Sequence, residues 1–574
     1  MHYRGLDRAL WLLLAFVCGG ASVAWAQTAF PLSSLIDPEV ALYVEVAHPD
    51  QQWDAWEQSE LARRWKQTGL EALFAQTDFV RHWRKMDDAV AQATPQSLTD
   101  HLRGLCGEGL SLAVFVPRQG PPQGLWVSRA RSAAVLDATL KAWDTLEPPV
   151  KTERRGVSRA EFFARRVRKG AQEQTLFYAR RDDVLILSDQ EALVSACALR
   201  LNDAADSAPT VPKSFLTEAD LVVPDASTAA VWVYGNPRAW DRWLDREFDN
   251  SPGAQLARNV WRSLRGLGAS LRLDAGPTLT ITATIDPRHE HPGWTAATTS
   301  AASDALARPE QLSVLHVAPD DAVLVAGGSL RPEWWLQKLQ MLQSDREKED
   351  WRRIQRVLRG AFGGLDPFGQ VAPALFRDWG VVVAPRGGAV PTLRPADWSV
   401  ASVHQLSAKA ETDAELVSAI DDALGLGMQL LAANINGTTE DAAVTPVRTR
   451  GDGTLGRVMS GRQEWEFGYE FAANRLLVGW PLAVMQQRFA TSTERETELS
   501  RLSAREFTAP SLMAWVNLEV VRAAVGNDPE QKHLKDRSPL AMRLAELVDR
   551  GFAAISVAPE RVEFKVGGRF ASTR

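Results

Sequence analysis

The sequence predicts an α+β protein built from two tandem copies of one module. Pairs of short apolar runs recur ahead of helical segments, and the same series of runs returns in the same order in the second half of the chain. At 574 residues, the chain also exceeds what one hydrophobic core usually supports. Short turns between adjacent strands favour antiparallel pairing, so each copy should hold an antiparallel or mixed sheet with helices packed on one face.

Four segments make up the predicted organisation. They are a signal peptide over residues 1–26, a first module over 27–286, a linker over 287–311 and a second module over 312–574. The linker is rich in Ala, Thr, Ser and Pro, a composition typical of connections between domains.

The N-terminus has the features of a secretory signal. Arg4 and Arg8 supply a basic start, Ala9 to Val17 is an apolar run too short to span a bilayer comfortably, and Ala24-Trp25-Ala26 gives small residues ahead of a cut before Gln27. We therefore expect an exported protein, periplasmic or extracellular, with no stable membrane insertion if the signal is cleaved.

The three cysteines leave two questions open. Cys18 stands where a lipoprotein cysteine could lie, although bulky residues precede it. Cys106 and Cys197 would both remain in the mature chain, and an oxidising compartment allows either a disulfide or two buried free thiols.

The duplication can be followed phrase by phrase. Four segments of the first copy are matched to four of the second, and the closing hairpins Ser270 to Ile285 and Ala554 to Phe570 also correspond. The matched phrases are Pro38 to Val44 with Pro319 to Val325, Leu112 to Gly120 with Gly380 to Gly388, Asp182 to Ser188 with Asn474 to Trp480, and Ala230 to Val233 with Met513 to Val516.

Individual elements follow from the same patterns. In the first copy we expect strands at 110–116, 125–129, 175–179 and 184–188, and helices at about 133–143 and 190–201. In the second copy, Ser344 and Glu347 form a capping box for a helix that Gly360 should stop. The polar stretch from Asn434 to Asp452 is predicted to be a loop.

Composition excludes some partners. Loss of the signal peptide moves the formal charge from -6 to -7, and this mild acidity argues against nucleic acid as a partner. Tryptophan is unusually frequent, at 21 residues against 5 tyrosines. Most indoles lie beside Leu and Val and should contribute to packing. Trp53-Trp56 and Trp334-Trp335 begin the helix after the first strand of each copy, where carbohydrate binding is the alternative to anchoring helix on sheet.

Common catalytic signatures are missing. The chain has no G-x-S-x-G, no H-E-x-x-H, no phosphate-binding loop with Gly-Lys-Ser/Thr and no C-x-x-C. Gly451 to Gly456 does spell G-x-G-x-x-G. A dinucleotide site needs that string to open a helix, whereas Arg457 to Phe471 is predicted as strand and turn. We expect a hairpin loop there and no cofactor.

Scattered polar groups each have a structural and a functional interpretation. His289-Glu290-His291 could present two imidazoles to a metal, but further ligands are lacking nearby, and a solvated linker explains it. Asp182-Asp183 and Asp320-Asp321 could be paired carboxylates, but both fit turn positions. The remaining mature histidines are single and are expected to be surface or core residues: His48, His82, His101, His316, His404 and His533.

A basic run lies between Arg154 and Lys169. Its cations could contact an anionic partner, or they could form the solvent side of a strand around Phe162, Phe163 and Val167.

The opening "LYVEV" and "VLVAG" strands and the "DDVLILSD" and "NRLLVGW" strands leading into helices resemble exported bacterial proteins of an uncharacterised family, domain of unknown function 3352. The resemblance covers most of the mature chain and implies export, tandem repetition and no catalytic residues to carry over.

We therefore expect an exported, non-enzymatic binding or structural protein whose partner is an unknown envelope or extracellular protein or polysaccharide. No catalytic, cofactor-binding or metal-binding residue is assigned. Two alternatives stay open: an enzyme with a site in the groove between the copies, and an envelope polysaccharide-contacting or adhesion protein that uses exposed tryptophan.

Overall fold

The chain divides into two compact units, residues 1–289 and residues 290–574. The structure, a computed structural model, describes residues 31–157, 159–169, 172–206, 229–247, 254, 258, 261–273, 276–285, 312–329, 345–376, 378–387, 391–406, 413–438, 443–448, 455–461, 466–472, 475–484, 486, 498–507, 510–528, 543–558 and 561–570. The predicted signal peptide, the linker, His289-Glu290-His291, Trp334-Trp335, Ser344 and His533 lie outside this description.

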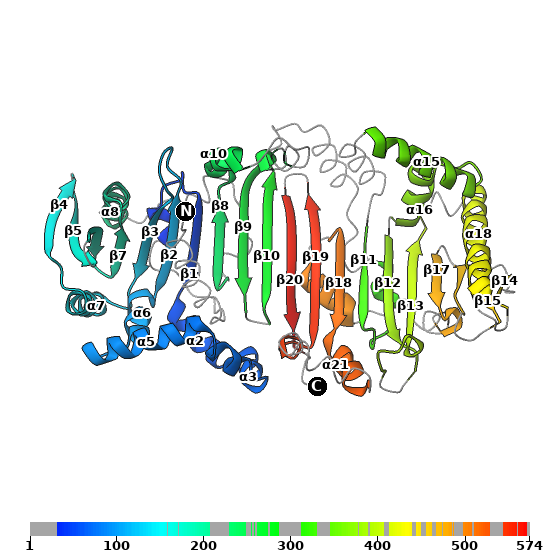
Figure 1. Cartoon of the computed structure of the whole chain (residues 1–574), viewed down its shortest axis with the longest axis horizontal. Coiled ribbons are helices and arrows are strands. Elements are labelled where there is room, and N and C mark those ends of the chain that lie inside the picture. The colour runs from blue at the N-terminus through cyan, green and yellow to red at the C-terminus, as the bar shows by residue number, and fades with distance from the viewer. Residues whose placement is uncertain are drawn as a thin grey trace. The chain divides into compact units, whose positions relative to one another are not determined.

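The first unit holds an antiparallel sheet, as the fold prediction allowed (Figure 1). Its strand order is β10-β9-β8-β1-β2-β3-β7-β6-β5-β4, and every one of these neighbouring pairs is antiparallel. The strands are β1 (Leu42–Ala47), β2 (Gly109–Phe115), β3 (Gln123–Arg129), β4 (Lys151–Val157), β5 (Ala160–Lys169), β6 (Gln172–Arg181), β7 (Val184–Ser188), β8 (Val231–Gly235), β9 (Leu264–Arg272) and β10 (Thr278–Ile285).

Helices of this unit begin at residues that suit a helix start. Ser59, Thr77, Ser97 and Ser132 each accept a hydrogen bond from the backbone N-H three residues later, which satisfies an otherwise unpaired amide. The helical elements are η1 (Leu32–Leu35), α2 (Pro49–Glu57), α3 (Glu60–Gln67), α4 (Leu70–Ala75), α5 (Asp78–Ala93), α6 (Leu98–Cys106), α7 (Ala133–Leu146), α8 (Glu191–Asp206) and α10 (Pro237–Glu247).

The second unit also holds an antiparallel sheet. Its strand order is β20-β19-β18-β11-β12-β13-β17-β16-β15-β14. The strands are β11 (Leu324–Gly328), β12 (Asp378–Pro385), β13 (Trp398–Gln405), β14 (Thr445–Arg448), β15 (Leu455–Ser460), β16 (Gly468–Ala472), β17 (Arg475–Trp480), β18 (Leu512–Asn517), β19 (Arg550–Ala558) and β20 (Arg561–Arg569). The helical elements are α13 (Ser313–Val317), α15 (Asp345–Ala361), η3 (Pro367–Val371), α16 (Ala372–Phe376), η4 (Pro395–Asp397), α18 (Ala414–Thr438), α20 (Glu498–Glu506) and α21 (Leu518–Asn527).

The two strand orders correspond strand for strand, β1 with β11 through β10 with β20. Backbone hydrogen bonds fix the residue correspondence: Ala41 N-H donates to Val114 C=O and Val323 N-H donates to Val383 C=O, both at 2.8 Å. Trp515 then lies opposite Val325 in the way that Tyr234 lies opposite Tyr43. The phrase matching that paired Trp232 with Trp515 was therefore displaced by two residues. The other three matched phrases were displaced by one residue each, because similar apolar strands can be aligned in several registers.

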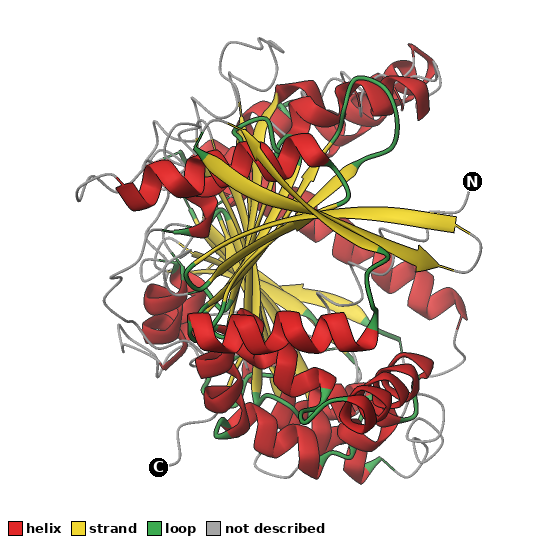
Figure 2. Cartoon of the chain, turned by 90° about the vertical axis from the view of Figure 1, so that its left-hand side faces the viewer, coloured by secondary structure: helices red, strands yellow, loops and turns green. Residues whose placement is uncertain are grey.

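Helices pack on both faces of each sheet, as Figure 2 shows for the first unit, so the expectation of helices on one face was wrong. On β7, Ile186 belongs to a buried cluster with side chains of α8, whereas the adjacent Leu185 packs with Leu136 of α7 on the opposite face. On β17, Leu476 likewise packs with α18 while Leu477 packs against the cluster of α13 and α20.

Two predicted boundaries in the second unit were also wrong. Helix α15 passes through Gly360 and ends at Ala361, because the left-handed residues that close it are Gly363 and Gly364, with Gly364 N-H donating to Arg359 C=O. The stretch from Asn434 is helical as far as Thr438, since Ile435 is still buried in the α18 core, and β14 follows. Asn436 then closes the turn through two hydrogen bonds to the backbone of Val444.

Helix α13 approaches its sheet closely, and glycine makes this approach feasible. A Cβ on Gly380 would lie 2.2 Å from the Val314 Cβ, and a Cβ on Gly327 would lie 2.6 Å from the Trp379 carbonyl oxygen. These separations are far below van der Waals contact.

The first prediction concerns this contact. Gly380→Ala should lower the free energy of unfolding of the second unit by about 1–3 kcal/mol, because the added methyl forces α13 away from the sheet. The measurement is urea denaturation followed by tryptophan fluorescence. Gly387→Ala is the matched control, because a Cβ there meets no atom within 4 Å. Equal midpoints for the two variants would contradict the close approach.

Candidate functional site

A cluster of ionisable side chains lies at one edge of the first sheet. We call it the junction cluster: Glu45, His48, Glu108, Arg129 and Asp183. The register places Ala47, Gly109, Arg129 and Val184 side by side on β1, β2, β3 and β7, so the ends of four neighbouring strands meet here. Residues distant in the sequence are thereby brought together where β1 leads into α2.

Glu45 is the most perturbed member of the cluster. Its Oε2 accepts a hydrogen bond of 2.6 Å from Tyr43 Oη, on the same face of β1. Burial raises the pKa of Glu45 to about 7, although the Tyr43 hydrogen bond and the charge of Arg129 both act to lower it. Burial and the neighbouring Glu45 in turn raise the pKa of Tyr43 well above its usual value. Glu45 therefore changes charge near neutral pH.

Arg129 balances the acids. Burial lowers the pKa of its guanidinium, and the charges of Asp183, Glu45 and Glu108 oppose that shift. Glu108 also contacts His48, with 3.2 Å between Oε2 and Nδ1. His48 has φ 45°, a left-handed conformation that is uncommon for a residue with a side chain and belongs here to the sharp change of direction into α2.

A second layer of ion pairs fixes the helices beside the cluster. Arg103 on α6 reaches Asp50 at 2.9 Å and Asp54 at 2.8 Å, both on α2, and Arg131 also pairs with Asp50. These charges are satisfied by one another, an arrangement typical of a positioned helix.

The second unit carries a different set of residues at the equivalent positions. By register, Glu45 corresponds to Gly327 and Arg129 to Gln405. The carboxyl group of Glu45 and the guanidinium of Arg129 therefore belong to the first unit alone.

One polar arrangement does occur in both units. Tyr178 on β6 and Tyr469 on β16 are equivalent by register, and each lies between a long helix and the outer strands with an Arg and an Asp beside it. Tyr469 Oη lies 2.5 Å from Asp421 Oδ1 on α18, and Arg457 pairs with the same carboxylate at 3.1 Å. Burial and Asp421 together raise the pKa of Tyr469.

In the first unit, Arg165 takes this role. It pairs with Asp144 and lies 4.3 Å over the ring of Trp143, while Trp143 also packs against Tyr178. Arg165 is only 2% exposed, so its expected place on the solvent side of a strand was wrong. Periodicity missed it because a buried cation needs a carboxylate from α7 that the local sequence does not reveal.

Several other cations of the basic run have acidic partners. Arg154 pairs with Glu161, Arg155 pairs with Glu191 at 2.5 Å, and Arg166 lies 3.5 Å from Glu153. These pairings reduce the positive charge that the run could offer to an anionic partner.

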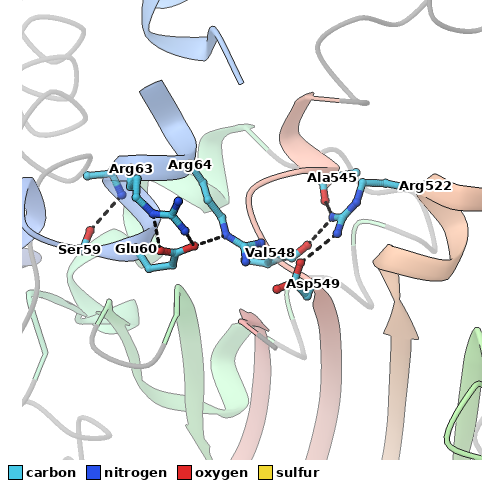
Figure 3. A network of polar contacts seen from close by, with 9 residues as sticks. Ser59, Glu60, Arg63, Arg64, Arg522, Ala545, Val548 and Asp549 are labelled. Atoms are coloured by element: carbon cyan, nitrogen blue, oxygen red, sulfur yellow. Dashed lines mark hydrogen bonds and ion pairs between the residues drawn. The ribbon is translucent and has the colours of Figure 1, made fainter. Parts of the chain in front are cut away.

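Similar local networks stabilise other helices (Figure 3). Glu60 accepts hydrogen bonds of 2.7 Å from Arg63 Nε and from Arg64 Nε within α3. In the second unit, Arg522 on α21 donates to the carbonyls of Ala545 and Val548 and to Asp549 Oδ1, at 2.6 to 2.9 Å. Exposed pairs of the first kind contribute little, whereas Arg522 satisfies backbone groups ahead of β19.

The other sequence candidates have structural positions. Asp182 is left-handed in the turn joining β6 to β7, as its turn prediction required. Gly456 lies in β15, so the glycine string leads into a strand and opens no helix. Asp320-Asp321 forms a turn before β11.

Cys106 and Cys197 are free and buried, and burial raises the pKa of both thiols. His404 is buried, with Nδ1 2.9 Å from the Leu375 carbonyl oxygen, and burial lowers its pKa. His101 is also buried, beside Thr94. Within the described parts of the chain, no three His, Cys, Asp or Glu side chains are grouped in a way that could hold a metal ion.

Helix α18 is long and apolar enough, by length and composition, to cross a membrane. Its buried side chains, including Ile420, Met428 and Ile435, form a core with strands β14 to β17. That packing is typical of a core helix of a folded unit.

Comparison with known proteins identifies no relative. No family model, curated protein or solved structure matches the chain.

The raised pKa of Glu45 predicts that the free energy of unfolding depends on pH. A carboxyl whose pKa is raised on folding destabilises the folded state as it ionises, so stability should fall as the pH rises from about 4.5 to about 7 and then level off. The full effect is about 3 kcal/mol. The difference in unfolding free energy between wild type and Glu45→Gln, measured with urea at several pH values, should trace this fall. A constant difference between pH 5 and pH 8 would contradict it.

The hydrogen bond between Tyr469 and Asp421 predicts that removing the tyrosine hydroxyl costs more stability in the second unit than in the first. Tyr469→Phe should lower the unfolding free energy by about 1–2 kcal/mol, because Asp421 loses a buried donor. Tyr178→Phe is the matched control and should cost much less, because Asp144 acts on the Tyr178 hydroxyl through its charge alone. Urea denaturation compares the two, and an equal loss in both would refute the assigned role of Tyr469.

Proposed function

We propose that this chain is an exported, non-enzymatic binding protein made by duplication of one α+β module, similar to the family of domain of unknown function 3352. We further propose that its second unit binds an acyl chain on the part of its sheet, over β11 and β18 to β20, that the described helices leave partly exposed on one face. Export rests on the signal-like N-terminus. Duplication is supported by the matching strand orders and by Asn236 and Asn517, whose N-H groups donate to the carbonyls of the equivalent residues Ala41 and Val323.

The observation that carries the binding proposal is an apolar face on β11, β18, β19 and β20. One side of these strands is buried, with Val325, Met513, Trp515, Phe552 and Ala554 in one core. Alternate residues point to the other side and are also apolar, yet they are only partly buried, and Ile555 and Phe564 are 36% and 37% exposed. A sheet with one solvated face normally alternates apolar with polar residues. We take this partly exposed apolar face as the proposed binding surface.

Residue size gives this face a trough across the strands. Leu512, Ile555 and Phe564 are directly paired across β18, β19 and β20 and form one large row. Ala326, Ala514 and Ala553 form the next row, which ends at Val566 on β20, and Leu324 and Val516 begin the row after that. Same-face rows are about 7 Å apart, so the alanine row is a shallow channel beside a wall of large side chains.

The trough favours an acyl chain over a peptide. A peptide lying across the middle of a sheet would bury N-H and C=O groups without partners, because the strands beneath it use theirs in the ladder. A hydrocarbon chain has no such groups. Peptides pair with sheet edges instead.

The same row is filled in the first unit. Its equivalents are Val44, Val233, Ala269 and Ile281, so valines replace two of the three alanines and an isoleucine replaces Val566. The proposed acyl site is therefore specific to the second unit.

Two features support a non-catalytic role. In the junction cluster, the charged groups face one another, with Arg129 among Glu45, Glu108 and Asp183. The polar arrangement present in both units, around Tyr178 and Tyr469, joins helix to sheet. The tryptophan alternative has less support, because a row of exposed indoles is expected there and Trp243, at 42%, is the one indole among the described residues that is exposed.

The proposal is tested with the mature chain and a fluorescent fatty acid. Wild type should bind it, and Ile555→Ser with Phe564→Ser should weaken binding about 10-fold to 100-fold, since each lost contact is worth on the order of 1 kcal/mol or more. Val357→Ser is the matched control, because Val357 is 69% exposed on α15, away from the trough. Absence of binding, or equal binding by the double variant, would overturn the proposal.

A further inference from the structure

The connection between β1 and α2 is made by a few hydrogen bonds, beside the ion pairs that Arg103 and Arg131 make with α2. His48 C=O accepts the Gln52 N-H at 3.1 Å, the Gln52 side-chain amide donates to Ala47 C=O, and Asp50 N-H donates to Gly107 C=O at 3.4 Å. The first turn of α2 is thus attached directly to the ends of β1 and β2. Any shift of the β1 end moves the acceptors that hold α2.

We infer that this connection in the first unit is a proton-operated joint, in which the charge on Glu45 decides how tightly α2 is held at the edge of the sheet. Glu45 lies two residues before Ala47 on β1. This inference is independent of the proposed acyl site, which lies on the second unit.

The charges around Glu45 determine whether its ionisation tightens or loosens the joint. Arg129 on β3 is the cation that favours ionised Glu45, and it lies near Glu108 and Asp183 as well. While Glu45 is neutral, the positive charge of Arg129 stabilises only the carboxylates of Glu108 and Asp183. When Glu45 loses its proton, three carboxylates compete for one guanidinium in a partly exposed site, and the repulsion among them opens the cluster.

The remaining neighbours transmit this change to α2. Glu108 contacts His48, the left-handed residue that begins α2, so a shift of Glu108 removes a contact at the turn. Tyr43 donates to Glu45 from the same strand, and Cys197 of α8 lies near Tyr43 and is held neutral by burial. Low pH closes the joint and higher pH loosens it.

Amide hydrogen exchange of the full mature chain tests the joint. Between pH 5.5 and pH 8.0, after correction for intrinsic exchange, protection in residues 49–57 should fall at least tenfold in wild type and stay constant in Glu45→Gln. Glu519→Gln on α21 is the control and should behave as wild type. Unchanged protection in wild type, or an equal fall in Glu45→Gln, would sink the inference.

A second variant changes the pH at which half of the protection in residues 49–57 is lost. A Glu45 with only a structural role would leave that pH unchanged. Tyr43→Phe removes the hydrogen bond that favours ionised Glu45, so the loss of protection should move to higher pH. An unmoved midpoint in Tyr43→Phe would overturn the joint even if Glu45→Gln failed to fold.

Discussion

The hydrogen-bonded register of one strand in each unit determines most of the structure. β1 lies between β2 and β8, and β11 lies between β12 and β18, so each is paired on both sides with strands from distant parts of the sequence. A slip of one residue would exchange the two faces of the strand. It would bring Leu324 into the core in place of Val325, and it would take Tyr43 out of the core and Glu45 out of the junction cluster.

Local pattern predicted the elements that local pattern controls. The strand at Val184–Ser188 was predicted with the bounds that the structure gives it, because the Asp182-Asp183 turn and the following helix mark both of its ends. Equivalence between the units was harder to predict, because strands of Val, Leu and Ala align almost equally well in several registers. Backbone pairing decides among them, and pairing is a property of strands distant in sequence.

The candidate sites show the same limit. Glu45 appears in the sequence as one acid in an apolar strand, and nothing nearby indicates Arg129, which β3 contributes 84 positions later. Arg165 was misplaced for the same reason, since its partner Asp144 belongs to α7. The trough is a different case. Alternate residues along its strands face opposite sides of the sheet, but the residues on both sides are apolar. Only the tertiary structure shows which side is buried and which is partly exposed.

The two units differ most at the position shared by Glu45 and Gly327, and close packing explains why neither residue suits the other unit. A side chain at Gly327 would collide with the Trp379 carbonyl and with Val314 of α13, so a carboxylate there would displace the helix. In the first unit, that position instead carries an acid that Tyr43 and Arg129 stabilise. One backbone position thus separates a unit that can bind a proton at the edge of its sheet from a unit that packs a helix there. In the second unit, the proposed ligand surface then lies on the opposite face of the same strands.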